Sequence, residues 1–153
     1  MLINMPMETV NVNIVVDVMK ALSERSLKGN AWLMDDSTSG SVGQGTDSLK
    51  TACRPGDLLR WKAYPVDLQA GVSILSVSFG QDECHRNGTA QQLPPHLNTW
   101  EGIVPYLEAQ EYPYRLALQM GKGRDSVMEL DTPSLLVNGC PHYITKQNEG
   151  GRT

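Results

Sequence analysis

Hydrophobic and polar residues alternate along several stretches of the chain. The clearest stretch runs from Val10 to Val18, where every second residue is aliphatic and polar residues such as Asn11 and Asn13 lie between. A period of two sends alternate side chains to opposite faces of a β-strand, which predicts a strand with one buried face. Three later stretches show the same alternation, at residues 59–63, 75–79 and 112–120.

Turn-forming residues divide the rest of the chain. Residues 20–28 have the composition for one or two helical turns, and Ala31–Asp35 is a short apolar run followed by a serine-rich surface loop at 36–41. Further runs occur at 100–106 and 134–137, and Gly121 begins a turn that predicts a hairpin between 112–120 and 127–130. Residues 80–99 hold no periodicity, and we interpret them as a long loop suited to binding.

Together these elements predict an all-β protein. About eight strands, at most one or two short helical turns and no internal repeat favour an antiparallel, jelly-roll-like β-sandwich. A chain of 153 residues is the size of one domain, so we expect a single domain over 1–153. Its ordered core is expected at about 9–145, with a polar tail at 146–153.

Charge and composition narrow the classes of partner. The net charge is −4, which provides no cationic field for nucleic acid or anionic lipid. No stretch approaches the roughly 18 apolar residues of a membrane span, and residues 1–8 lack the features of a signal peptide. Three cysteines, Cys53, Cys84 and Cys140, form an odd set without short paired spacing, which favours reduced thiols. We therefore expect a cytoplasmic protein that neither binds nucleic acid nor inserts into a membrane.

Motifs of common enzymes are missing from the sequence. Gly40 to Gly45 supplies glycines, but Thr46 and Asp47 follow where a phosphate loop needs lysine and a hydroxyl residue. There is no Gly-x-Ser-x-Gly elbow and no His-Glu-x-x-His pair. These observations predict a protein that is not an enzyme and needs no cofactor.

Two kinds of binding site deserve comparison. Zinc could use thiolate and imidazole ligands from Cys84, His85, Cys140 and His142. Adjacent Cys-His cannot easily point both side chains at one ion, and the gap of more than fifty residues is not diagnostic, so we predict no metal site.

A carbohydrate site fits the chemistry better, because sugars stack on aromatic faces while planar amide and carboxylate groups bridge their hydroxyls. The alternative is that the tryptophans lie in the core and the polar residues in turns. The candidate ligand-binding residues are Asn30, Trp32, Asp35, Asp82, Asn87 and Trp100.

Several motifs carry a resemblance to a known family. They are Asn30-Ala31-Trp32-Leu33-Met34-Asp35, Gly43-Gln44-Gly45-Thr46-Asp47-Ser48-Leu49 and Gly56-Asp57-Leu58-Leu59-Arg60-Trp61. Together with Val10 to Val18, they resemble the AidA/PixA family of bacterial inclusion-body proteins. The resemblance extends over about residues 9–137 and is strongest at 30–79.

The resemblance implies an abundant cytoplasmic protein of host-associated Gram-negative bacteria, stored in some cases as crystalline inclusions. It supplies no catalytic residues. Seven methionines are fewer than in the most methionine-rich members, which argues against a pure sulfur store. Our first hypothesis is a non-enzymatic inclusion-body or host-association protein that self-assembles as a homo-oligomer or crystalline inclusion, because low net charge weakens mutual repulsion. Its loops are candidate ligand sites, and release to the host without a signal peptide is compatible with it. The alternative is a soluble lectin that binds glycans through loops at one end of the sandwich.

Overall fold

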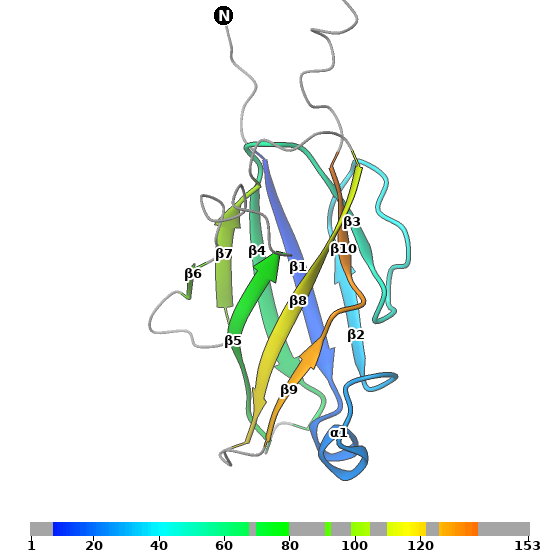
Figure 1. Ribbon diagram of the computed structural model, residues 1–153, viewed down its shortest axis with the longest axis vertical. Coiled ribbons are helices and arrows are strands. Elements are labelled where there is room, and N and C mark those ends of the chain that lie inside the picture. Colours follow the sequence, from blue (N-terminus) through cyan, green and yellow to red (C-terminus); the bar gives the residue numbers. More distant parts are fainter. Residues whose placement is uncertain are drawn as a thin grey trace, which may run out of the picture.

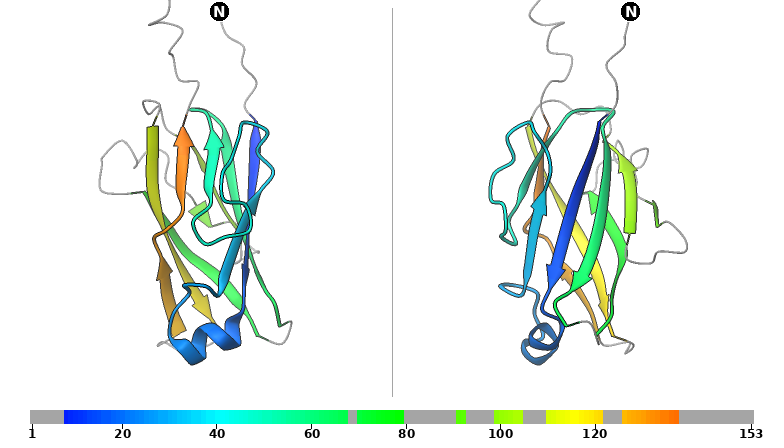
Figure 2. Two further views of the ribbon diagram at one scale, coloured as in Figure 1. Left: turned by 90° about the vertical axis from the view of Figure 1, so that its right-hand side faces the viewer. Right: turned by 180° about the vertical axis from the view of Figure 1, so that it is seen from behind.

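Two β-sheets packed face to face form the protein, as the computed structural model shows (Figures 1 and 2). The structure describes residues 8–67, 70–79, 91–92, 99–104, 110–121 and 126–137. Its elements are β1 (Thr9–Val16), α1 (Val18–Glu24), β2 (Ala31–Asp35), β3 (Lys50–Cys53), β4 (Leu58–Pro65), β5 (Val72–Phe79), β6 (Gln91–Gln92), β7 (Thr99–Ile103), β8 (Gln110–Met120), β9 (Val127–Leu130) and β10 (Ser134–Val137). The predicted all-β sandwich is confirmed.

The order of strands defines the two layers. The first sheet runs β2-β1-β4-β7-β6, and the second runs β3-β10-β8-β5 with β9 also paired to β8. Most neighbours are antiparallel, including the predicted hairpin of β8 and β9, in which Leu116 faces Leu130.

Two strand pairs depart from the antiparallel arrangement expected. β1 pairs with β4 in parallel over its whole length, and β3 pairs with β10 in parallel. Parallel partners cannot be joined by a tight hairpin, so their turns leave no local signal of the pairing in the sequence. The sheets are therefore mixed.

The core lies between the sheets and follows the alternation seen in the sequence. In β1, Val12, Ile14 and Val16 are fully buried, whereas the residues between them are partly exposed. Trp61 of β4 packs edge to face against Tyr114 of β8, with ring centroids 5.6 Å apart. The Trp61 Nε1–H donates a hydrogen bond of 3.3 Å to the Tyr114 hydroxyl, so the aromatic contact also joins the two layers.

The helical turns expected at 20–28 form α1 over Val18–Glu24, so Val18, which was expected to end the strand, begins the helix instead. Asp17 caps it by accepting a hydrogen bond from the Lys20 amide at 3.2 Å, and Arg25 ends it in the left-handed conformation. Val18 and Ala21 are its buried residues. No helix in the described ranges is both long and apolar enough to cross a bilayer.

Strand β3 is an element that the sequence pattern missed. Thr51, Ala52 and Cys53 are all buried in succession, so the strand lacks the alternation by which the others were found. In the predicted loop at 80–99, residues 91–92 form β6 and Thr99 begins β7. The other residues of that loop lie outside the described ranges.

Candidate functional site

Asn30, the first candidate ligand residue, is part of the folded interior. Its side chain is buried, and its Nδ2 donates to the Glu24 carboxylate at 2.8 Å and to the Ser26 carbonyl at 3.0 Å. Both amide protons are thereby used within the connection from α1 to β2. In this arrangement Asn30 holds that connection together.

Trp100 belongs to the interior as well. It lies opposite Trp61 in the pairing of β4 with β7, and it packs against the hydrophobic core. Its Nε1–H donates a 2.7 Å hydrogen bond to the carbonyl oxygen of Ile74, which belongs to the second sheet. The indole therefore bridges the two layers.

Asp35 lies at the end of β2 and shares the inward register of Ala31 and Leu33. Its Oδ1 accepts hydrogen bonds from the Ser37 amide and the Gln44 side chain, both at 3.0 Å. Its Oδ2 is buried without a hydrogen-bond partner. This carboxylate is directed toward the core at one end of the sandwich.

Ionisable groups near Asp35 are held in their neutral forms. Burial raises the pKa of the Cys53 thiol to about 12, with smaller contributions from the charges of Asp57 and Asp35. Burial also raises the pKa of Tyr114 above its usual value, against a smaller opposite effect of its hydrogen bond with Trp61. Neither group is activated as a nucleophile, because activation requires a lowered pKa.

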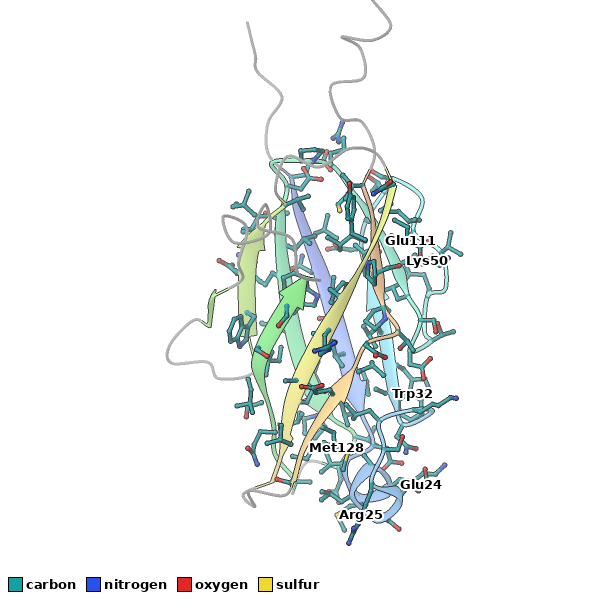
Figure 3. All side chains as sticks on the ribbon, in the orientation of Figure 1. Glu24, Arg25, Trp32, Lys50, Glu111 and Met128 are labelled. Atoms are coloured by element: carbon teal, nitrogen blue, oxygen red, sulfur yellow. The ribbon has the colours of Figure 1, made fainter. Side chains whose placement is uncertain are left out.

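Trp32 is the described candidate residue that lies on the outside. Its neighbours Ala31 and Leu33 are buried, so its side chain points to the other face of β2, and Figure 3 shows it at the margin of the sandwich. It faces Val15 of β1, and Val15 in turn faces Tyr64 of β4. Trp32, Val15 and Tyr64 thus form one row, which we call the outer row.

The outer row brings together residues that the sequence did not associate. Tyr64 is 39% exposed, and Val66 beyond it is 56% exposed. The alternation in β4 already placed Tyr64 on the solvated face, beside Lys62 and opposite the inward Ala63. What the sequence could not show is the parallel pairing of β1 with β4, which aligns the row.

The remaining candidate residues belong to the part of the chain outside the described ranges. Asp82 and Asn87 lie outside the described residues, as do the cysteine and histidine residues considered for zinc, Cys84, His85, Cys140 and His142. Within the described ranges, no group of three His, Cys, Asp or Glu residues could hold a metal ion. The four described candidates do not form one surface, because three of them face inward and Trp32 faces outward.

Residues 36–49, here called the edge loop, connect β2 of the first sheet to β3 of the second. Against β2, the Leu33 amide donates to Thr46 O at 3.0 Å and the Gly45 amide donates to Leu33 O at 2.7 Å. The Gln44 side chain extends this pairing, because its Oε1 accepts from the Asp35 amide at 2.8 Å. The loop therefore pairs with β2 as a strand would.

The same loop also closes the edge of β3. Val42 and Lys50 exchange two backbone hydrogen bonds, of 3.0 and 2.7 Å. Ser41 Oγ accepts from the Ala52 amide at 2.9 Å, and Ser37 Oγ donates to the Ala52 carbonyl at 2.6 Å. An edge strand with unpaired backbone groups is a site for strand addition, and here those groups are occupied.

The fold and these contacts define a mixed β-sandwich closed along one side by a loop, with a row of partly exposed apolar side chains on one sheet. The chain belongs to the family described as "Domain of unknown function (DUF8788)", which matches residues 8–126. No curated protein matches the sequence.

Among solved structures, the chain is similar to the crystal structure of an inclusion body protein, PixA, from Burkholderia cenocepacia J2315. The TM-score is 0.60 at 8% identity, and the match covers 90% of this chain and 96% of that chain. Identity this low shows a common fold. The resemblance to AidA/PixA proteins is thus supported at the level of the fold.

Proposed function

We propose that this protein is a non-enzymatic protein that accumulates to high concentration in the cytoplasm and associates with itself, as an inclusion-body protein does. The observation that carries the proposal is the match of 90% of the chain to the fold of an inclusion body protein. The fold alone does not determine a function, so the proposal also needs support from this chain's own surface.

Two features of the chain agree with self-association. The outer row carries the exposed Tyr64 and the partly exposed Trp32 and Val15 on a sheet face, where contiguous apolar surface marks sites of interaction. The net charge of −4 is small for 153 residues, so copies of the chain repel one another weakly. Both features favour association when the protein is abundant.

The test is the size of the particle as a function of concentration. Light scattering coupled to size exclusion, from about 10 μM to about 1 mM, should show mass rising above 16.8 kDa as concentration increases. Overproducing cells should contain refractile inclusions. A strict monomer throughout this range, with diffuse protein in the cells, would contradict the proposal.

A second candidate function is carbohydrate binding, favoured by Trp32 and Tyr64 in one exposed row. Asn13 and Lys62 occupy the next row of the same face and offer hydrogen-bonding groups to sugar hydroxyls. A glycan array with and without calcium tests this function, followed by titration of any ligand against Trp32→Ala. A ligand that binds Trp32→Ala with the same affinity as the original chain would show that the outer row is not the carbohydrate site.

A further inference from the structure

We propose that two copies of this chain associate through the outer face of the sheet formed by β2, β1, β4 and β7. This inference rests on the proposed self-association and names the surface of its first step, the dimer; larger assemblies need a further contact. The view from behind in Figure 2 looks onto this face, and none of the described elements crosses it.

The face has an apolar end and a polar centre. The outer row of Trp32, Val15 and Tyr64 lies toward the end at which β1 runs into α1, and Val66 adds a further 56% exposed side chain beside Tyr64. Cross-strand neighbours lie about 5 Å apart, so the row is continuous over three strands. The next row carries Met34, also partly exposed, on the flanking strand. A continuous apolar row gains more from burial than isolated residues do.

The outer face of the second sheet is a poorer candidate. Two of its apolar residues, Leu75 on β5 and Val127 on β9, are 43% and 41% exposed, but they lie on opposite sides of β8. Between them, Arg115 pairs with Glu129 at 3.9 Å, and Gln119 donates to Ser126 at 2.6 Å. Both outer faces carry charged and amide groups, but on the second sheet these groups separate the two apolar side chains, so covering them gains no continuous apolar row.

Association by strand addition is blocked along one side of the sandwich. The edge loop already pairs with β2 and β3, so neither strand offers free backbone groups at the positions it covers. Sheets can also associate by packing face to face, as the two sheets of this chain themselves do. Face-to-face contact is therefore the remaining mode on this side.

Charge on the proposed surface is balanced, although the whole chain carries −4. Arg60 is paired with Glu101 at 2.5 Å, and Asp36 accepts two hydrogen bonds of 2.8 Å from Asn11. With Lys62 included, the surface carries two positive side chains, Arg60 and Lys62, and two negative ones, Glu101 and Asp36. A second copy approaching this face meets no net repulsion from it.

The area of the face indicates the strength of the contact. The strands β1 and β4 contribute eight residues each, and β2 and β7 contribute five each. At about 3.3 Å per residue and 4.8 Å between strands, the face measures about 400 Å² per copy, or about 800 Å² for a pair. The accessible surface exceeds this flat projection, which places the contact nearer the weak class, below about 1,200 Å², than the standard size of about 1,600 Å². We therefore expect association at high concentration, and a two-fold contact of this kind closes at the dimer.

The experiment compares two lysine substitutions in the full chain by sedimentation velocity over a concentration series. Tyr64→Lys places a charge in the outer row, and Val127→Lys places the same charge on the opposite face at a residue of similar exposure, 41% against 39%. We expect Tyr64→Lys to raise the dimer dissociation constant at least about tenfold, and Val127→Lys to change it less than about twofold. Val66→Lys serves as a second outer-face variant, and circular dichroism confirms that each variant folds.

The outcomes separate this inference from the proposed function. If the original chain dimerises and both lysine variants dimerise equally well, the proposed surface is wrong, but self-association still stands. A chain that never dimerises would overturn both. If the chain stays monomeric but an oligosaccharide quenches tryptophan fluorescence, and Tyr64→Lys abolishes the quenching, the face binds glycan and the second copy is the wrong occupant.

Discussion

The contribution of the edge loop to stability can be measured at two of its glycines. Gly43 and Gly45 flank Gln44, and both have positive φ, +89° and +80°. An alanine at either position adopts a backbone conformation that L-residues disfavour. The two sites differ in the space around the new methyl group, which makes Gly45→Ala a matched control for Gly43→Ala.

The structure gives the expected magnitudes. At Gly43 an added Cβ would lie 3.2 Å from the Ser48 carbonyl oxygen and 3.3 Å from Thr46 Oγ1, whereas at Gly45 it would meet no atom within 4 Å. The backbone conformation costs about 1 to 2 kcal/mol at both sites. Crowding against main chain adds about 1 kcal/mol at Gly43. We expect Gly43→Ala to lose about 1 kcal/mol more than Gly45→Ala.

Urea unfolding of the two variants and the original chain, followed by tryptophan fluorescence and circular dichroism, measures these losses. Two-state behaviour with an unchanged dependence on urea is needed for the comparison. Hydrogen exchange adds a local measurement, because the Leu33 amide donates to Thr46 O and should exchange faster in Gly43→Ala. Equal free-energy losses in the two variants, or protection of Leu33 unchanged in both, would refute the close packing inferred for the loop.

Three further predictions concern groups inside the sandwich and on its face. The pKa of the Cys53 thiol is raised from 9.0 to about 12 by folding, so the neutral thiol favours the folded state. Its contribution to the free energy of unfolding is complete below pH 9 and falls by about 1.4 kcal/mol per pH unit as pH rises toward 12. Urea unfolding of Cys53→Ala above pH 9 should show a shallower loss than the original chain, and equal slopes would contradict this. Asn30→Ala should lose about 1 to 3 kcal/mol in thermal unfolding, since it leaves the Ser26 carbonyl without its donor; a neutral result would return Asn30 to the candidate ligand residues. Glu101→Gln should lose less than about 1 kcal/mol despite the short Arg60 contact, because the Arg60 side chain is 36% exposed; a loss above about 2 kcal/mol in the same assay would show that the pair matters more than its exposure suggests.

Much of the fold could be predicted because strands with one solvated face show an alternation of apolar and polar residues in the sequence. β1 alternates along its whole length, and β8 alternates from Tyr112 to Met120, just before the turn that begins at Gly121. β3 could not be predicted in this way, because its covered outer face leaves Ala52 as buried as Thr51 and Cys53. The parallel pairings were equally hidden, since they depend on contacts between strands far apart in the chain.

The candidate site was harder to predict, because residue type does not reveal the direction of a side chain. Trp32 and Trp100 are both strand tryptophans with mixed neighbours, yet Trp100 bonds to Ile74 across the interior and Trp32 lies on the outer face. Asn30 precedes a strand and resembles a turn residue, but α1 and its connection bury it. Each distinction depends on tertiary packing that a single sequence does not encode locally.

One of the motifs that carry the family resemblance, Gly43 to Leu49, has a structural role in the edge loop. Gly45 pairs with Leu33 and Gln44 with Asp35, both on β2, and Thr46 Oγ1 donates to the Gly43 carbonyl at 2.7 Å, so these residues hold the edge loop in place. Chains that share such a segment are expected to share the closed edge. Similarity of this kind indicates a shared fold and does not indicate a shared function. A structural match at 8% identity is consistent with this. Differences in function among such chains should therefore be sought on the open faces of the sandwich, where the outer row of this chain lies and where substitutions leave the core and the closed edge intact.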